Sequence, residues 1–242
     1  MIRTPLALAA VAAVSLAVAL PVSAADVTDD EVGDAASFAQ PVKWLGLVSG
    51  SVELDTDCSP ETPTDPPRTN CIVLNPAPAF TSFDRPDLDK ITLPGKSAQS
   101  LICHWQTPIA NVFWQNPTAS TANARISVRP YYRIESDVLA DPSLINPQTG
   151  LPFGGGFESA LTSVNESQPL GAGQSQSRNY TFTRTCIGGL VSRNFLTRSL
   201  GLSDAVAEAI FSKPITIRVG LRGSAQLVQV ASINVGTRFV GD

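Results

Sequence analysis

The sequence predicts an all-β protein, a single antiparallel β-sandwich that is immunoglobulin-like or related, with one inserted short helix and long loops. Apolar residues recur mostly with a period of two, which is the period of a strand with one buried face. The short runs that show this period are rich in β-branched and aromatic residues, and turn residues separate them; the 242-residue chain has 17 Gly and 19 Pro. One domain over residues 39–242 is within the size range of all-β folds.

Seven runs carry the strand pattern, and one of them shows it most clearly. In residues 126–134 one face holds Ile126, Val128, Tyr132 and Ile134, and the other holds Ser127, Arg129, Tyr131 and Arg133. Pro130 cannot donate to a ladder, so this strand is expected at a sheet edge or a bulge. The other predicted strands are residues 43–54, 101–105, 110–114, 180–186, 215–222 and 226–239.

A single helix is predicted between two of these strands, beginning after Ser203 and ending before Pro214. Ser203 is a favoured N-cap residue, and Val206, Ala209 and Ile210 have helical spacing. Three segments rich in Pro, Gly or acidic residues are predicted as long loops, and sandwiches usually bind through such loops. They are residues 59–70, 76–93 and 141–173.

The amino-terminal region has the pattern of an export signal. Arg3 precedes an apolar stretch over residues 6–20, and Val22-Ser23-Ala24 fits a cleavage site, so residues 1–24 are predicted to be a signal peptide. Residues 25–38 form an acidic lead that is expected to be mobile. No second apolar run approaches spanning length. After cleavage we therefore expect a protein without a membrane span, secreted or periplasmic.

The four cysteines predict two disulfide bonds, since bridges persist in oxidising compartments outside the cytoplasm. Cys58 and Cys71 bracket a proline-rich segment, so a bridge between them would hold an irregular loop. Cys103 and Cys186 each lie in a strand-like run and form the remaining pair. A zinc site built from all four lacks any C-x2-C spacing.

Charge and motif content exclude several classes of protein. The chain carries 17 Lys+Arg against 21 Asp+Glu, whereas a nucleic-acid binder normally shows a basic excess. His104 is the single histidine, and no G-x-S-x-G motif accompanies it. We therefore expect no catalytic residues and a protein that is not an enzyme.

Two groups of charged residues remain as binding candidates. Polar faces of two predicted strands carry residues able to grip a carboxylate, sulfate or sugar acid, provided the strands pair; these are Arg129, Tyr131, Arg133, Arg218 and Arg222. Three alternating carboxylates, Glu53, Asp55 and Asp57, are weak candidates for calcium, which takes oxygen ligands. No other cofactor is predicted.

These observations favour an exported, non-catalytic binding or structural protein of the periplasm, envelope or cell surface. Its expected partner is another envelope or surface protein or a glycan. A carbohydrate-binding module or sugar-active enzyme is one alternative, with Trp44, Trp105, Trp114 and Tyr131 in a groove. The other is a subunit that forms homo-oligomers by adding a strand to a neighbour's sheet edge.

Overall fold

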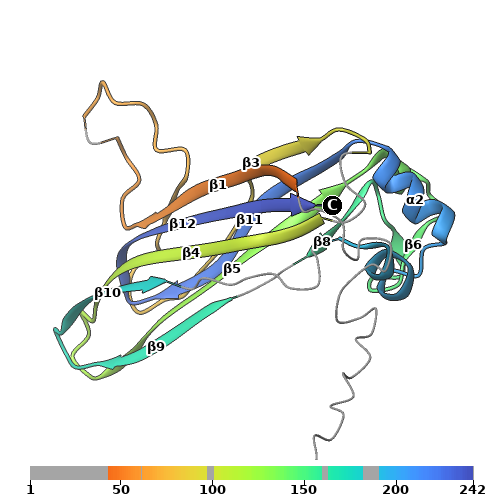
Figure 1. The fold of residues 1–242 in the computed structure, drawn as a ribbon. Helices are drawn as coiled ribbons and strands as arrows, with labels where there is room; N and C mark the ends of the chain where they lie inside the picture. Colours follow the sequence, from red (N-terminus) through yellow and green to blue (C-terminus); the bar gives the residue numbers. More distant parts are fainter. Residues whose placement is uncertain (1–42, 61, 97–100, 160–162, 182–190, 242) are drawn as a thin grey trace, which may run out of the picture.

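A computed structural model describes residues 43–60, 62–96, 101–159, 163–181 and 191–241, and their side chains except at 43 and 101–108. Two β-sheets pack face to face in this part of the chain (Figure 1). The first has the strand order β10-β4-β12-β1-β2, and the second β3-β11-β5-β8, with β9 also paired to β5. The predicted all-β sandwich is confirmed.

Within the described ranges ten strands form the two sheets, and a two-stranded hairpin stands apart from them. The first sheet contains β1 (Lys43–Asp55), β2 (Cys71–Val73), β4 (Leu101–Gln115), β10 (Ser175–Thr181) and β12 (Val228–Gly241). The second contains β3 (Thr81–Leu93), β5 (Ala122–Glu135), β8 (Gly156–Ser159), β9 (Val164–Leu170) and β11 (Ile215–Gln226). The hairpin joins β6 (Ile145–Asn146) to β7 (Leu151–Pro152). The β1–β2 pair is parallel and departs from the expected antiparallel pattern.

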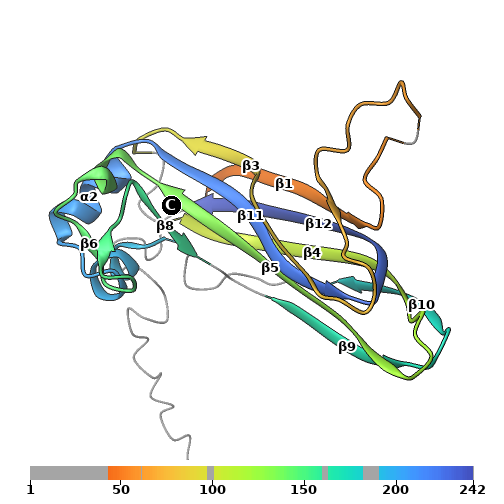
Figure 2. The same ribbon diagram turned by 180° about the vertical axis from the view of Figure 1, so that it is seen from behind.

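The predicted helix is present as α2 (Asp204–Ser212), at one end of the sandwich (Figures 1 and 2). The Ser203 hydroxyl accepts a hydrogen bond from the Val206 amide at 3.4 Å, as expected of an N-cap. Its apolar face is buried through Ala207, Ile210 and Phe211. Two shorter pieces, a 3-10 turn (Asp137–Ala140) and a π-helical turn (Phe195–Ser199), complete the helical part of the described chain.

The core lies between the sheets and follows the alternation of the strands. Residues of β5 that were predicted to share the apolar face are buried, namely Ile126, Val128, Tyr132 and Ile134. Trp114, Ile233 and Phe239 of the first sheet belong to the same buried cluster, and the rings of Phe239 and Tyr132 pack edge to face. The hydroxyls of Tyr132 and Thr237 are hydrogen-bonded to each other across the core, which satisfies both buried groups.

The free edge of β1 is covered by β3, and glycines make this close approach possible. The Ser49 amide donates to the Asp89 carboxylate at 2.9 Å. A Cβ atom at Gly50 would lie 2.6 Å from Leu88 Cβ, and one at Gly46 would lie 2.1 Å from Ile91 Cδ1. An exposed edge amide would otherwise be open to pairing with another chain. The second sheet therefore protects the first along this edge.

Three predictions are wrong, two about loops and one about the position of a strand. Residues 76–93 were expected to be a loop, but most of them form β3. Residues 141–173 contain β6, β7, β8 and β9. The strand that carries Pro130 was expected at an edge or bulge, yet β5 lies inside its sheet. Pro130 nevertheless falls between the residues of β5 that pair with β9 and those that pair with β8.

Several predictions fall on residues outside the described part of the chain. They are the signal peptide (residues 1–24), the acidic lead (residues 25–38), Cys186, and the side chains of Cys103, His104 and Trp105. Among the residues that are described, none of the helices combines the length and the apolar character that crossing a bilayer requires.

Candidate functional site

Residues 56–70, the disulfide loop, project from the sandwich at the end opposite α2 (Figure 1). Its described side chains are exposed, apart from the half-buried Cys58 and Arg68. Proline, which cannot donate to a ladder, stands at positions 60, 63, 66 and 67 and excludes regular structure here. A turn forms nonetheless, in which the Asp65 amide donates to the Thr62 carbonyl at 3.1 Å. Proline at the second turn position favours this geometry.

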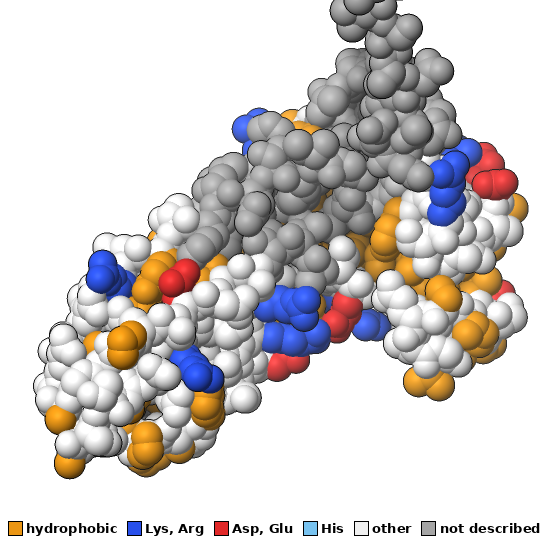
Figure 3. Space-filling model, turned by 90° about the horizontal axis from the view of Figure 1, so that it is seen from below, with side chains coloured by type: hydrophobic (Ala, Val, Ile, Leu, Met, Phe, Trp, Pro, Cys, Tyr) orange, Lys and Arg blue, Asp and Glu red, His pale blue; other side chains and the backbone are white. Residues whose placement is uncertain are grey.

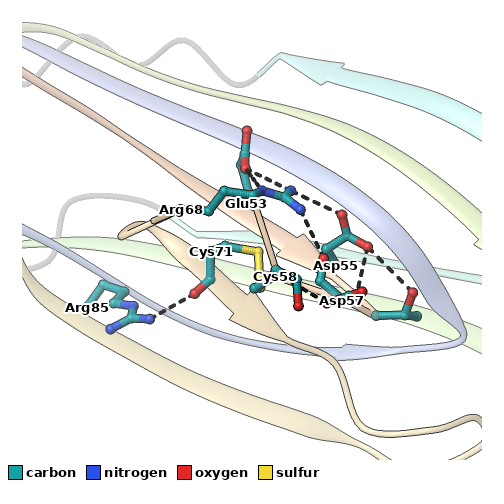
Figure 4. Close-up of polar contacts among 9 residues, drawn as sticks. Glu53, Asp55, Asp57, Cys58, Arg68, Cys71 and Arg85 are labelled. Carbon is teal, nitrogen blue, oxygen red and sulfur yellow. Dashed lines mark hydrogen bonds and ion pairs between the residues drawn. A yellow bond between two sulfur atoms is a disulfide. The ribbon is translucent and has the colours of Figure 1, made fainter. Parts of the chain in front are cut away.

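The two ends of the disulfide loop are joined by the bridge between Cys58 and Cys71, so this predicted pairing is confirmed (Figure 4). The Cα atoms of the two cysteines lie 5.7 Å apart. Cys71 is also the first residue of β2, and its carbonyl accepts a hydrogen bond from Arg85 of β3 at 3.0 Å. The base of the loop is thereby connected to both sheets.

Arg68 provides a second attachment, between the end of the disulfide loop and strand β1 (Figure 4). Its Nη2 atom lies 2.9 Å from Glu53 Oε2 and 3.0 Å from Asp55 Oδ2. Its Nη1 atom donates to the Asp57 carbonyl at 2.9 Å. Hydrogen bonds to Glu53 and then Asp55 raise the pKa of the guanidinium above its ordinary value. This role of Arg68 was not predicted, because only a base at position 68 beside nearby acids indicated it.

The same geometry bears on the calcium prediction. Glu53 and Asp55 lie on one side of β1, but the Arg68 guanidinium is placed between their carboxylates. Asp57 instead accepts a hydrogen bond from the Ser59 amide at 2.8 Å, and its bonds with Ser59 lower its pKa. In the described ranges, no three or more His, Cys, Asp or Glu side chains are grouped as a metal site would need. Calcium binding gains no support from this arrangement.

The five residues predicted to bind an anion lie together on the outward face of the second sheet, here called the arginine face. Strands β5 and β11 pair as the prediction required. Their register places Arg133 beside Arg218, Tyr131 beside Gly220, and Arg129 beside Arg222. Alternation along the two strands was therefore sufficient to predict which side chains share the face.

Carboxylates neutralise most of the arginine face. Arg222 makes two hydrogen bonds to Glu158, at 2.9 and 3.1 Å, and a third to Asp84 at 3.0 Å. The remaining ion pairs are Arg218 with Glu135 at 2.8 Å and with Asp87 at 3.1 Å, and Arg133 with Glu135 at 3.1 Å. In the view of Figure 3, basic and acidic side chains likewise lie next to one another. Arg133, Arg218 and Arg222 are thus already bound within the protein.

Tyr131 is held in the same network and is only 2% exposed. Its hydroxyl donates to Asp84 Oδ1 at 2.7 Å, and the Arg222 guanidinium lies 3.9 Å from the centre of its ring. Burial, followed by the hydrogen bond to Asp84, raises the pKa of Tyr131 to about 12. A Cβ atom at Gly220 would lie 2.4 Å from the ring, so glycine leaves the space that Tyr131 fills. Tyr131 therefore contributes to the sheet and not to an open binding surface.

The Asp84 interactions make stability depend on pH, and Asp84→Asn tests this. Burial opposes ionisation of Asp84, but hydrogen bonds from Tyr131 and Arg222 outweigh it and lower the pKa below 3.8. A lowered pKa stabilises the fold above the unfolded pKa, and this contribution is lost as pH falls through the folded pKa. The urea midpoint of wild type should exceed that of the variant at pH 7 and approach it near pH 2. An equal difference at both pH values would contradict this.

The aromatic residues proposed to line a sugar groove are dispersed, as far as the structure describes them. Trp114 is fully buried in the core, whereas Tyr131 lies on the outer side of the other sheet. Trp44 is 55% exposed, with the Arg238 guanidinium 4.4 Å from its ring centre. These three side chains do not form one groove.

Comparisons with known proteins give no family and no curated relative: no family model matches the chain, and no curated protein does. One solved structure with some similarity is a chain of the T13 IBDV viral particle. The two chains are 8% identical, and their TM-score is 0.18. The match covers 81% of this chain but only 35% of the viral chain. A similarity of this size supports no conclusion about fold or function.

Proposed function

We propose that the protein is an exported, non-catalytic binding protein of the periplasm, envelope or cell surface, and that the disulfide loop contacts its partner. The observation that carries the proposal is the attachment of this loop. The Cys58–Cys71 bridge and the contacts of Arg68 with Glu53 and Asp55 fix the base, while the side chains beyond it are exposed.

Such a loop is suited to binding because its order is established before the partner arrives. Ordering a free loop on association costs free energy, and a segment that is already held in place avoids part of that cost. Loops on rigid scaffolds are accordingly the usual binding elements of sandwich domains. The proline residues restrict the backbone further by fixing φ.

The chemistry of the loop favours a protein partner over a glycan. Residues 56–70 contain no aromatic side chain that could stack on a sugar ring. They carry Asp57, Glu61 and Asp65 against the single base Arg68, which is itself paired at the loop base. The projecting part is thus acidic, and it fits a protein surface that presents basic groups.

A loop replacement tests the proposal. Residues 59–67 are exchanged for a Gly/Ser sequence of equal length, with Cys58, Arg68 and Cys71 retained. The readout is saturable binding of the labelled mature protein to intact source cells. We expect binding to weaken at least about tenfold, because interface energy is concentrated in few residues. The matched control exchanges residues 147–150, in the turn of the small hairpin between β6 and β7, and should bind as wild type. Unchanged binding by the variant, or no saturable binding by wild type, would refute the proposal.

A further inference from the structure

The outward face of the second sheet contains a concave region of about 330 Å³ at the end away from the ion pairs of Arg218. Its shape follows from the register of four strands. Ser82, Ser224, Ser127 and Asn165 are neighbours across β3, β11, β5 and β9, and their small side chains form one row. Larger side chains stand in the rows beside it, including Phe80 and Arg125. The hollow is thus a row of short polar side chains between rows of long ones.

Two arginines of β5 flank this row and have no carboxylate partner. Arg125 and Arg129 lie two positions before and after Ser127, so all three project from the same face of the strand. Both arginines are exposed, and within the described chain neither side chain makes a hydrogen bond or ion pair. This separates them from Arg133, Arg218 and Arg222, whose guanidinium groups are bound to acids. A free guanidinium can bind a carboxylate through two parallel hydrogen bonds.

The other side chains around the hollow fit a sugar. Phe80 is 47% exposed and offers an apolar surface for the C–H face of a pyranose ring. Ser127, Ser167 and Ser224 bring hydroxyl groups that both donate and accept, as sugar hydroxyls do. The Ser127 hydroxyl already donates to Asn165 Oδ1 at 2.7 Å, which fixes its direction. A sugar presents hydroxyl groups on most of its ring carbons, whereas an acidic peptide offers this row only one N–H and one C=O per residue in its backbone.

From this arrangement we infer a binding site for a uronic-acid residue of a polysaccharide. Arg125 binds the carboxylate, Phe80 packs against the ring, and the serine hydroxyls bind the ring hydroxyls. Glu166 is paired with the buried Ile126, so its carboxylate lies on the inner side of the sheet and not among the outward side chains that would contact the sugar. No residue of the disulfide loop takes part, so the inference stands independently of the function proposed above.

The test is a titration of the mature protein with galacturonic acid, and with galactose as the neutral sugar of the same ring configuration, monitored by NMR chemical shifts. Wild type should bind galacturonic acid saturably and galactose at least about tenfold more weakly, since a charge-assisted hydrogen bond is lost. Arg125→Ala should weaken galacturonic acid binding by a similar factor. Phe80→Ala should weaken the binding of both sugars. Arg238→Ala removes an exposed arginine from the opposite sheet and should change neither affinity.

Three results would overturn the inference: no saturable binding of galacturonic acid by wild type, equal affinity for the two sugars, or full affinity in Arg125→Ala. Arg125 is exposed and without partners, so its replacement should leave the fold intact, which circular dichroism would verify. The variant with the replaced disulfide loop should bind galacturonic acid as wild type does. Absence of galacturonic acid binding would therefore not contradict the proposed role of the disulfide loop. Absence of partner binding by the loop would likewise not contradict the sugar site.

Discussion

Trp114→Ala is expected to lower the free energy of unfolding by about 3–5 kcal/mol, which is the usual cost of removing a buried aromatic side chain. Trp114 is fully buried, and its ring packs edge-on against Tyr180, with ring centres 5.8 Å apart. It lies on β4 opposite residues of both β10 and β12. The truncation leaves a cavity that these strands cannot fill without moving. Urea unfolding followed by far-ultraviolet circular dichroism measures the loss.

Two variants on the same strand make this result specific. Phe113 is adjacent but faces outward and is 36% exposed, so Phe113→Ala should cost about 1 kcal/mol or less. Trp114→Phe keeps most of the volume and removes an indole N–H that has no hydrogen-bond partner among the described residues. It should be far less destabilising than alanine. Equal losses for Trp114→Ala and Phe113→Ala would show that the core is misassigned.

Replacing Cys58 and Cys71 together by serine is the second change with a large expected effect. The bridge spans a sequence separation of 13 residues. A loop of about this length restricts the unfolded chain by about 3 kcal/mol in the chain-entropy account, and the variant should lose a comparable stability. Cys71 is also buried, so the serine hydroxyl adds a desolvation cost. Comparing the urea midpoints of the double variant and wild type, both measured without reductant, gives this loss of stability.

The control for this pair is Arg68→Met, which keeps the bridge and removes the contacts with Glu53 and Asp55. Because these side chains are partly exposed, the urea midpoint should fall much less than that of the double serine variant. We therefore expect the disulfide to contribute more to the stability of the loop base than Arg68 does. If the double serine variant unfolded at the wild-type midpoint, the bridge would contribute nothing to stability.

Alternation of apolar residues was sufficient to predict the interior strands and the buried face of β5. The helix could also be predicted from the sequence, because Ser203 and Pro214 mark its two ends. Strand β3 was missed because its residues 84–90 include one proline and several acids, which are typical of a loop. Its strand conformation depends on partners in β11, namely Arg222 for Asp84 and Arg218 for Asp87. Irregular pairing between Val219 and Leu221 of β11 accommodates Pro86.

The arginine face was also only partly predictable: alternation along a strand can be seen in the sequence, but contacts between residues far apart in the sequence cannot. The period of two predicted which arginines share a side, and strand pairing brought them together. Their neutralisation could not be predicted, since Arg222 and its partner Asp84 are 138 positions apart in the sequence. Arg125 was not predicted as a binding residue, because the strand was predicted to begin at residue 126, one position after it. The disulfide at the loop base was predicted because its cysteines are close in sequence and bracket prolines.

Photo-crosslinking from the disulfide loop tests the proposed function most directly. A photoreactive residue is placed at Thr64, in the exposed part of the loop, or at Gln148 in the turn between β6 and β7, and each protein is irradiated on intact source cells. We predict a discrete covalent adduct from position 64, absent from position 148 and suppressed by excess unlabelled wild type. Adducts from position 148 alone, or from neither position, would contradict a partner bound at residues 56–70.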